Sequence, residues 1–447
     1  MLTVAFYTLG CKVNQYETEA MMDLFKEQGY RIVDFQKEAD IYVVNSCTVT
    51  TSAASKSRKY ARRAKRRNPE AVVAVVGCYP QVSPEEVKEI EEIDLVVGTD
   101  NKQRIVELIE KQTQERATSN PDLTEINPIK DYTQLTEYED LGVKEFRQTT
   151  RANIKIEEGC NQFCSYCIIP YARGPVRSRS QDSVLAEVKK LTRSGIKEIV
   201  LTGIHLGAYG LDRDNEGELV ELLKKLLKIE SMGRIRLSSI EVTEVQPELL
   251  ALMQTEEKMC KHLHLPLQSG SDYILDLMNR PYTSAEFREK VLAIKEQIPE
   301  IAITTDVIVG FPGEKEEHFQ DTFSLVQDLD LSRLHVFPFS AREGTPAAEM
   351  ENKVSSEIIN QRSSNLRDLN KKLMARFQES FIGSHQLVVV EEKREQKTGL
   401  LTGITGNYIR VLLEGNDSFK NELVEVKLED TINYQKVRGK IVKKKEF

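Results

Sequence analysis

Three cysteines near the middle of the chain, Cys160, Cys164 and Cys167, have residue types and a spacing that suit metal chemistry. Their C-x3-C-x2-C loop is long enough to wrap one corner of a cubane cluster and place a thiolate on each of three irons. The fourth iron of such a 4Fe–4S cluster stays open to a small ligand. Structural zinc sites usually have two C-x2-C pairs or add histidine, and this loop has neither. The spacing therefore favours a cluster used in catalysis over a zinc site.

Three further cysteines, Cys11, Cys47 and Cys78, each come just after a predicted β-strand. The carboxyl ends of the strands in a parallel sheet lie along one edge, where such folds bind ligands. Three cysteines separated by 36 and 31 residues can therefore converge in space. The alternative is three unrelated buried thiols, because cysteine is common in protein cores. Their shared position at three strand ends favours convergence.

The remaining cysteine, Cys260, lies outside any spacing pattern, and we interpret it as an ordinary thiol. His262 and His264 alternate along a predicted strand, so their side chains point to the same face. Two histidines on one face can bind a metal ion. Histidines that form ordinary hydrogen bonds within a sheet are more common, and we favour that interpretation.

Length and composition describe a globular chain with more than one core. Its 447 residues predict two or three domains. No apolar run approaches the roughly 18 residues of a membrane helix, and the first residues do not resemble a signal peptide, so we expect a cytoplasmic protein without membrane contact. Seven cysteines in such a chain favour metal or redox chemistry over disulfides. The net charge of −8 means that any RNA contact must come from local patches.

The elements that would position the first three cysteines lie in residues 1–114, where short β-rich runs alternate with helical patterns. This alternation predicts a parallel α/β domain. Residues 115–148 are polar and weakly periodic, with Asn-Pro turns, and are interpreted as a linker. The predicted strands are 4–10, 41–46, 72–77 and 95–98, and the predicted helices are 17–28, 52–67 and 102–114.

A second alternating α/β series is predicted for residues 149–375, and it contains the central cysteine loop. Residues 376–447 instead contain short strands separated by Gly, Asn and Asp, which predicts a small β-barrel. The expected fold class is therefore α/β with an added C-terminal barrel. The strands of the central series are predicted at 198–202, 235–240, 262–265, 303–309 and 334–337, with a closing helix at 355–378.

A cationic helix is predicted from Lys56 to Arg67, where eight of twelve residues are basic and none is acidic. Ser57, Ala61 and Ala64 recur at helical spacing and would face inward, leaving a basic outer stripe suited to phosphate contacts. An ordinary solvated helix face is the alternative. The candidate RNA-binding residues are Arg58, Arg62, Arg63 and Arg66 in this helix, with Tyr408, Lys443 and Lys444 near the C-terminus.

A series of motifs along almost the whole chain resembles the radical-S-adenosylmethionine (SAM) methylthiotransferases. The resemblance implies an N-terminal methylthiotransferase domain, a central radical-SAM partial (β/α) barrel and a C-terminal TRAM-like barrel that binds RNA. The motifs that carry it are residues 9–15, 45–50, 77–81, 159–174, 265–271, 306–314 and 337–346.

The resemblance also implies two 4Fe–4S clusters and SAM as cofactors. Cys160, Cys164 and Cys167 would hold the cluster that binds SAM and cleaves it reductively to a 5′-deoxyadenosyl radical. Cys11, Cys47 and Cys78 would hold a second cluster, which the family uses in sulfur delivery, while another SAM supplies the methyl group. The expected SAM contacts are Tyr166, Thr202, Gly203, Ser239, Glu241, Gly310 and Phe311, and Arg173, Arg177 and Arg179 are candidates to meet SAM or RNA.

Three subfamilies share this architecture and differ in substrate. They modify isopentenyl-adenosine in tRNA, an aspartate of a ribosomal protein, or N6-threonylcarbamoyladenosine beside the tRNA anticodon. Residues 9–19 and 168–174 resemble the third group most, which implies methylthiolation at C2 of N6-threonylcarbamoyladenosine. A non-enzymatic alternative is an iron–sulfur RNA-binding or sensor protein. The expected partners are tRNA and an electron-donor protein of the flavodoxin or ferredoxin type; the sulfur donor stays open, and we expect a monomer.

Overall fold

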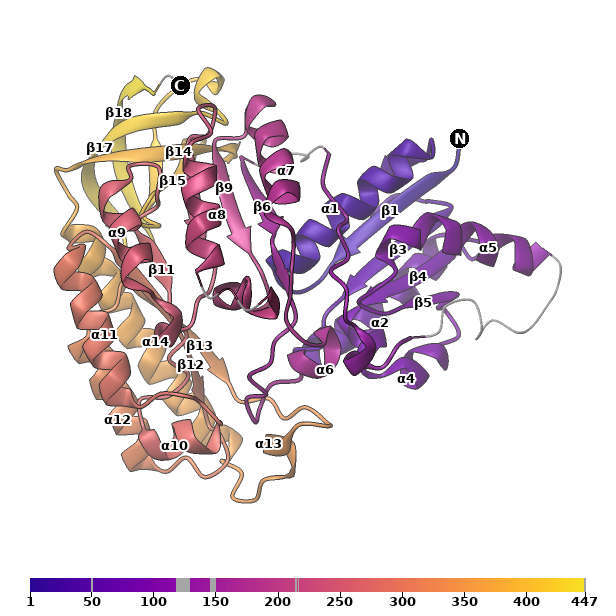
Figure 1. The fold of residues 1–447 in the computed structure, drawn as a ribbon, viewed down its shortest axis with the longest axis horizontal. Helices are drawn as coiled ribbons and strands as arrows, with labels where there is room; N and C mark the ends of the chain where they lie inside the picture. Colours follow the sequence, from indigo (N-terminus) through magenta and orange to yellow (C-terminus); the bar gives the residue numbers. More distant parts are fainter. Residues whose placement is uncertain (50, 118–128, 145–149, 214, 216, 446–447) are drawn as a thin grey trace.

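The computed structural model describes residues 1–49, 51–117, 129–144, 150–213, 215 and 217–445 (Figure 1). The chain starts with a parallel α/β part, continues into a curved array of parallel strands flanked by helices, and ends in a small barrel. This architecture confirms the predicted fold class. None of the helices in these ranges combines the length and the apolar character needed to cross a membrane.

The N-terminal part is a five-stranded sheet in which all strands run parallel, in the order β2-β1-β3-β4-β5. β3 and β4 are buried along their whole length, as expected for parallel strands between two helical layers. Helices α1 and α5 pack on one face through Met21, Phe25 and Ile109, and α2 covers the other through Ala61 and Ala64. The strands are β1 (Thr3–Thr8), β2 (Arg31–Val33), β3 (Ile41–Ser46), β4 (Val72–Gly77) and β5 (Leu95–Val97), and the helices are α1 (Lys12–Glu27), α2 (Thr51–Arg67) and α5 (Ile105–Ala117).

Helix α1 begins at Lys12, five residues before the predicted start at residue 17. Its first turns carry Asn14, Glu17 and Thr18, which are polar and yet buried. Because that face packs against polar groups, apolar periodicity did not reveal it. Edge strand β2 and the short helices α3 (Cys78–Val82) and α4 (Pro84–Lys88) were not predicted either.

The described part of the predicted linker packs against its neighbours. The Gln81 side chain donates a hydrogen bond to the carbonyl of Lys130 (2.8 Å), and the Tyr138 hydroxyl donates one to the carbonyl of Lys155 (2.8 Å). Residues 129–144 therefore join the N-terminal sheet to the central part. The rest of the predicted linker, 118–128 and 145–148, lies outside the described residues.

The central part is built on two parallel three-stranded sheets, ordered β6-β9-β10 and β11-β12-β13. Parallel bridges between Ile235 and Met259 and between Ser239 and His264 join β10 to the β11 side, so the six strands form one curved array. Six helices pack their apolar sides against it in a single large core. The strands are β6 (Arg151–Lys155), β9 (Glu198–Thr202), β10 (Arg234–Leu237), β11 (His262–His264), β12 (Ala302–Val309) and β13 (Arg333–Pro338), and the helices are α7 (Gln181–Arg193), α8 (Glu218–Leu227), α9 (Pro247–Thr255), α11 (Ser284–Gln297), α12 (Glu316–Asp328) and α14 (Ser356–Glu379).

Several of these helices begin at side chains that cap the free backbone N–H groups of the first turn. Ser180 accepts a hydrogen bond at the start of α7, Ser355 does so at the start of α14, and Thr283 and Glu286 form a reciprocal capping box at the start of α11. Shorter elements lie in the connections: β7 (Glu157–Glu158), α6 (Ile169–Arg173), β8 (Arg177–Ser178), α10 (Asp272–Leu277), α13 (Pro346–Glu349), and the 3-10 helices η1 (Lys102–Arg104), η2 (Tyr132–Gln134), η3 (Leu206–Ala208), η4 (Leu211–Arg213), η5 (Val242–Glu244) and η6 (Asp417–Phe419).

The C-terminal part is a closed five-stranded barrel in the order β14-β15-β16-β18-β17, as the strand spacing predicted. Alternate residues such as Val388, Val411, Val426 and Val437 fill its interior. Because the barrel is closed, it has no unpaired edge strand that could pair with another chain. The strands are β14 (His385–Arg394), β15 (Leu401–Thr405), β16 (Arg410–Leu413), β17 (Leu423–Asn433) and β18 (Lys436–Lys444).

Two buried arginines of β10 fasten this barrel to the central part. Arg234 donates hydrogen bonds to the carbonyls of Leu387 (2.9 Å) and Ile404 (2.8 Å), and Arg236 donates to the carbonyl of Thr405 (3.0 Å). Both guanidinium groups also bind the buried carboxylate of Glu198 (2.6 and 2.8 Å). One carboxylate therefore balances two cations at the domain junction.

Changing Glu198 to alanine is expected to destabilise the protein by about 3–5 kcal/mol, because it leaves two arginines buried without their counter-charge. Burial would raise the pKa of Glu198, but the charges of Arg234 and Arg236 outweigh it and hold that pKa well below its usual range. Because the folded-state pKa is depressed, this stabilisation is present above the unfolded value of about 4.3 and is lost on further acidification. Urea unfolding near pH 7 and pH 4 measures it. Glu289→Ala, at an exposed site on α11, is the control, and an equal loss in both variants would contradict the assignment.

Candidate active site

The central cysteine loop leaves the short strand β7 and is held in one conformation by backbone contacts. Gly159 has φ +91°, and a Cβ there would lie 1.9 Å from the carbonyl oxygen of Pro175, so only glycine fits. The N–H of Cys160 donates to the carbonyl of Gly174 (3.0 Å), and the N–H of Cys167 donates to the carbonyl of Cys164 (2.9 Å). The loop therefore turns back on itself.

Two cationic side chains from distant parts of the chain reach these thiols. Arg280 donates to the sulfur of Cys164 (3.2 Å) and pairs with Glu241. His205 Nδ1 lies 3.7 Å from the sulfur of Cys160, and its Nε2 lies 2.6 Å from the carboxylate of Glu244. Burial lowers the pKa of His205, but hydrogen bonding to Cys160 and Glu244 raises it to about 11. Both groups supply positive charge beside ligands that become thiolates on metal binding.

Sequence reasoning missed Arg280 and His205. His205 offered a signal, because it follows the carboxyl end of β9, the edge at which parallel sheets place functional residues. Arg280 lies 116 residues beyond Cys164, in the turn after α10, and nothing in its local pattern points to sulfur. Its role follows only from the fold.

The three N-terminal cysteines follow the carboxyl ends of β1, β3 and β4, which are neighbours in the sheet. The structure brings them together as the strand pattern predicted. Gly10 has φ +103°, and a Cβ there would lie 3.1 Å from the sulfur of Cys47, so the chain next to Cys11 crosses close to that thiol. Burial raises the pKa of the Cys78 thiol to about 12, and metal binding would therefore have to displace a proton.

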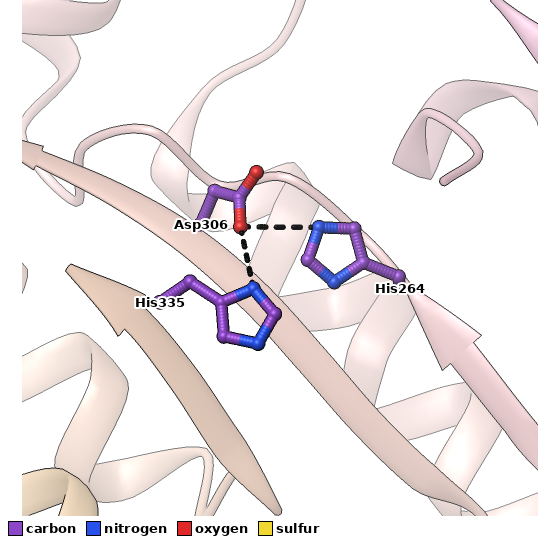
Figure 2. Close-up of side chains that lie close together, drawn as sticks. All are labelled: His264, Asp306 and His335. Atoms are coloured by element: carbon purple, nitrogen blue, oxygen red, sulfur yellow. Dashed lines mark hydrogen bonds and ion pairs between the residues drawn. The ribbon is translucent and has the colours of Figure 1, made fainter. Parts of the chain in front are cut away.

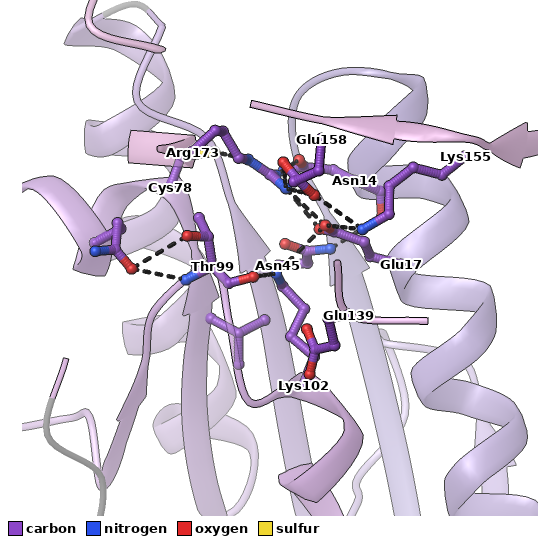
Figure 3. Close-up of polar contacts among 12 residues, drawn as sticks. Asn14, Glu17, Asn45, Cys78, Thr99, Lys102, Glu139, Lys155, Glu158 and Arg173 are labelled. Atoms are coloured by element: carbon purple, nitrogen blue, oxygen red, sulfur yellow. Dashed lines mark hydrogen bonds and ion pairs between the residues drawn. The ribbon is translucent and has the colours of Figure 1, made fainter. Parts of the chain in front are cut away.

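A buried polar network lies behind these cysteines (Figure 3). Arg173 is fully buried and donates to the sulfur of Cys78 (3.1 Å), to the carboxylate of Glu17 (2.6 Å) and to the side-chain oxygen of Asn14 (2.6 Å). Glu158 accepts from the same guanidinium (3.1 Å). Arg173 ends α6, just beyond the central cysteine loop, so this one side chain ties that loop to the N-terminal cysteines.

Arg173, Arg177 and Arg179, which were expected to meet SAM or RNA, bind instead to other groups of the protein. All three are buried, at 0%, 7% and 2% exposure. Arg177 donates to the carbonyl of Arg173 (2.9 Å), and Arg179 pairs with Asp140 (2.8 Å) and with Glu187. A run of arginines after a loop resembles a surface patch in sequence, but here each guanidinium is used within the protein.

One large cavity, of about 990 Å³, opens between the three parts of the chain. The expected SAM contacts Thr202, Gly203 and Ser239 line it at the ends of β9 and β10. Cys11 lines the same space from the N-terminal sheet edge, and Tyr408 lines it from the barrel. The cavity therefore adjoins one N-terminal cysteine, the sheet edge expected to bind SAM, and the barrel.

The other expected SAM contacts lie near the central loop. Tyr166 packs edge-on against Phe311, with 6.5 Å between ring centroids, and the Phe311 side chain is fully buried. The N–H of Gly310 donates to the carboxylate of Glu314 (2.8 Å). Glu241 binds Arg280 rather than standing free. None of these four lines the large cavity.

Three side chains on β11, β12 and β13 meet on the cavity wall (Figure 2). The carboxylate of Asp306 lies 3.2 Å from His264 Nε2 and 3.2 Å from His335 Nδ1. Burial would raise the pKa of Asp306, but hydrogen bonds from both histidines lower it to about 2. His264 Nδ1 also lies 2.8 Å from the Thr304 hydroxyl. His264 therefore has a hydrogen-bond partner on each ring nitrogen, the interpretation favoured above over metal binding. His262 lies 3.1 Å from the same hydroxyl, and its Nδ1 has no partner among the described residues.

Most of the expected RNA contacts lie on two outer surfaces. Ser57, Ala61 and Ala64 are fully buried, which confirms the predicted inward face of α2. On its outer face, Arg58, Arg62, Arg63 and Arg66 line a shallow groove with Lys59. Arg58 pairs with Glu86 (2.7 Å) and Arg62 with Glu92 (3.4 Å). On β18, Lys443 pairs with Glu425 (3.3 Å) and Lys444 with Glu422 (2.8 Å), whereas Tyr408 faces the cavity instead of the outside.

Known families and proteins resemble this chain over almost its whole length. A family model described as the radical SAM superfamily matches residues 154–326, and one described as uncharacterized protein family UPF0004 matches residues 3–98. Threonylcarbamoyladenosine tRNA methylthiotransferase MtaB of Bacillus subtilis is 42% identical, over 96% of this chain and 94% of its own. The protein of that name from Aquifex aeolicus is 40% identical, over 93% and 97%.

This chain is also similar to a relative whose name gives a different substrate. The tRNA-2-methylthio-N(6)-dimethylallyladenosine synthase of Acetivibrio thermocellus is 35% identical, over 98% of this chain and 90% of its own. Among solved structures, the radical S-adenosylmethionine methyltransferase TsrM of Kitasatospora setae aligns with a TM-score of 0.60 at 16% identity, over 77% of each chain. At that identity the likeness concerns the fold alone.

Proposed function

This chain belongs to the radical-SAM methylthiotransferases that act on tRNA, and we propose that it attaches a methylthio group to C2 of N6-threonylcarbamoyladenosine in tRNA. Two relatives that share 40% or more of their residues with it carry that substrate in their names. The relative named for dimethylallyladenosine is less similar, at 35%. The remaining alternatives are isopentenyl-adenosine in tRNA and the aspartate of a ribosomal protein.

The observation that carries this proposal is the shared cavity. Cys11, Thr202 and Tyr408 line one space, although they come from three different parts of the chain. A reaction that joins a sulfur source, a SAM-derived radical and an RNA base needs such a junction, because the three reactants must come within bonding distance. A sensor protein with closed clusters would not need it.

The cysteines fit two iron–sulfur clusters. Each set offers three converging thiols, and the seventh cysteine, Cys260, belongs to neither, so each cluster would keep one open iron. Cys160, Cys164 and Cys167 would hold the cluster that, when bound, supplies the electron for cleavage of SAM to a 5′-deoxyadenosyl radical. Cys11, Cys47 and Cys78 would hold the second, which serves sulfur insertion.

The chain's own residues prepare these sites. Arg280 and Arg173 each donate a hydrogen bond to a cysteine sulfur, which offsets the negative charge of a thiolate-bound cluster. Thr202, Gly203 and Ser239 would orient SAM along the ends of β9 and β10, and Tyr166 would lie beside its adenine. The outer face of α2 and the exposed lysines of β18 would hold tRNA phosphates.

Changing Arg173 to glutamine is expected to lower iron binding by the N-terminal cysteines about 10- to 100-fold, because the residue orients and charge-balances that set. It would be measured as iron per chain in a background lacking Cys160, Cys164 and Cys167, where one cluster of about four irons remains. Arg376→Gln, at an exposed arginine of α14, is the control. Full iron retention in the Arg173 variant would show that Cys78 does not need this contact.

Mass spectrometry of tRNA nucleosides tests the substrate. A strain lacking the gene, and any second enzyme for this modification, should contain N6-threonylcarbamoyladenosine without its 2-methylthio form, and the gene should restore it. Cluster-loaded protein with SAM and a reductant should convert the same tRNA in vitro. Conversion of isopentenyl-adenosine tRNA alone would overturn the proposed substrate and leave the family assignment intact.

A further inference from the structure

The cavity wall carries more positive than negative charge. Four of the described lining residues are lysine or arginine, and Asp306 is the single carboxylate among them. Asp306 is already engaged by His264 and His335. The four cations are Lys12, Arg333, Arg410 and Lys436. A cavity with this balance favours an anionic ligand.

Two of these cations are neutralised within the protein, and two are not. Arg410 pairs with Glu391 (3.2 Å) and Lys436 with Glu395 (3.3 Å). In the part of the chain that the structure describes, no hydrogen bond or ion pair reaches the side chain of Lys12 or Arg333. Arg333 is exposed to solvent, whereas Lys12 is partly buried. A partly buried ammonium without a partner is costly, so Lys12 is the cation that needs an anion most.

The surroundings of Lys12 add to this demand. Lys12 begins α1 directly after Cys11. Burial lowers the pKa of Lys12, and the charges of Arg236 and Arg151 lower it further. The charges of Tyr408 and Glu198 raise it. An anion bound at Lys12 would lie between the N-terminal cysteines and the barrel.

Three lining residues also carry a buried polar atom that lacks a partner within the described part of the chain. Ser238 Oγ, His262 Nδ1 and Gln378 Oε1 are buried, and each belongs to a lining residue. None has a hydrogen-bond partner among the described residues. The wall of the cavity is therefore polar as well as cationic.

We propose that Lys12 binds the carboxylate of the substrate's N6-threonylcarbamoyl group and so selects this nucleoside over one with an apolar N6 substituent. The inference rests on the proposed function and names its specificity residue. In adenine, C2 and C6 are both bonded to N1, so the bonds that leave these two carbons diverge without pointing in opposite directions. With C2 beside the N-terminal cysteines, the N6 substituent would lie to one side of them, within the same cavity. Lys12 directly follows Cys11 in the chain and lines this cavity.

Binding of a labelled anticodon stem-loop RNA to the cluster-loaded protein tests this. Three RNAs are compared: one with N6-threonylcarbamoyladenosine, one with the methyl ester of the same group, and one with unmodified adenosine. The wild type should bind the carboxylate form about tenfold tighter than the ester, as expected for one charged hydrogen bond. Lys12→Gln should bind both equally, and Lys12→Arg should restore most of the preference.

Matched variants separate the possible sources of the effect. Lys290→Gln, on the outer helix α11, should leave every affinity unchanged. Arg333→Gln should change the preference less than Lys12→Gln, and the reverse order would overturn the assignment to Lys12. Equal weakening of the unmodified RNA by Lys12→Gln would identify a backbone phosphate as the anion and would also overturn it. Iron content and the visible absorption of each variant verify that the neighbouring cluster is intact.

Turnover separates this inference from the function on which it rests. If the wild type does not methylthiolate RNA bearing N6-threonylcarbamoyladenosine, the proposed substrate is wrong, and the role of Lys12 is overturned with it. If the wild type does so and Lys12→Gln keeps the preference for the carboxylate, only the role of Lys12 is overturned.

Discussion

Protein in which Cys160, Cys164 and Cys167 are changed to alanine should form no 5′-deoxyadenosine from SAM under reducing conditions. The loop offers three thiols and no fourth ligand, so its removal abolishes the cluster rather than weakening it. Iron should fall from about eight to about four per chain. Liquid chromatography of the reaction mixture, with iron analysis of the same sample, measures both.

The seventh cysteine provides the control for this experiment. Cys260 is buried at 4% exposure and belongs to neither set, and its change to alanine should keep both iron and SAM cleavage. SAM cleavage by the triple variant at the wild-type rate would mean that another site makes the radical. If only one of the three cysteines is changed, partial SAM cleavage is compatible with the assignment only where iron analysis shows that some of the central cluster remains.

The cysteine positions and the strand pattern were predictable because they are local properties. β4 is an unbroken apolar run, and each N-terminal cysteine follows such a strand by one to three residues. Once the sheet is parallel, the carboxyl ends of neighbouring strands must lie along one edge. The convergence of Cys11, Cys47 and Cys78 therefore follows from the alternation of strands and helices alone.

The charged groups around the cysteines were not predictable from local pattern. Arg173 binds Glu17 from 156 residues away, and Arg280 binds Glu241 from 39 residues away. In sequence these residues look like ordinary surface charges. The same network buries polar residues at the start of α1, which explains why that helix was predicted to begin too late. Buried ion networks are long-range features, and they become visible only when the fold is known.

Tyr408 shows a different limit. It was a candidate RNA contact of the predicted barrel, and it adopts φ +68° in the turn between β15 and β16. That conformation is uncommon for a residue with a side chain. The ring lies 4.2 Å from the Arg236 guanidinium and 4.5 Å from the ring of His262. A single left-handed residue thus turns an expected surface contact into part of the cavity wall.

Changing Cys11, Cys47 and Cys78 to alanine should have the opposite signature to loss of the central loop. The central cluster remains, so SAM should still be cleaved to 5′-deoxyadenosine when reductant is present. Methylthiolated nucleoside should disappear, because the cysteines that would serve sulfur insertion are gone. Iron should again fall to about four per chain. Mass spectrometry of the tRNA and chromatography of the SAM products, taken from one reaction, report the two activities together.

Retained SAM cleavage together with loss of methylthiolated nucleoside distinguishes a methylthiotransferase from an enzyme that only makes a radical. Arg173 links the two cysteine sets, so the N-terminal variant must be shown to keep its fold, by circular dichroism and by full iron in the central loop. If methylthiolated product persists in that variant, sulfur reaches the base without these cysteines. If SAM cleavage is lost as well, the two sets act as one site, and the division of labour proposed here is wrong.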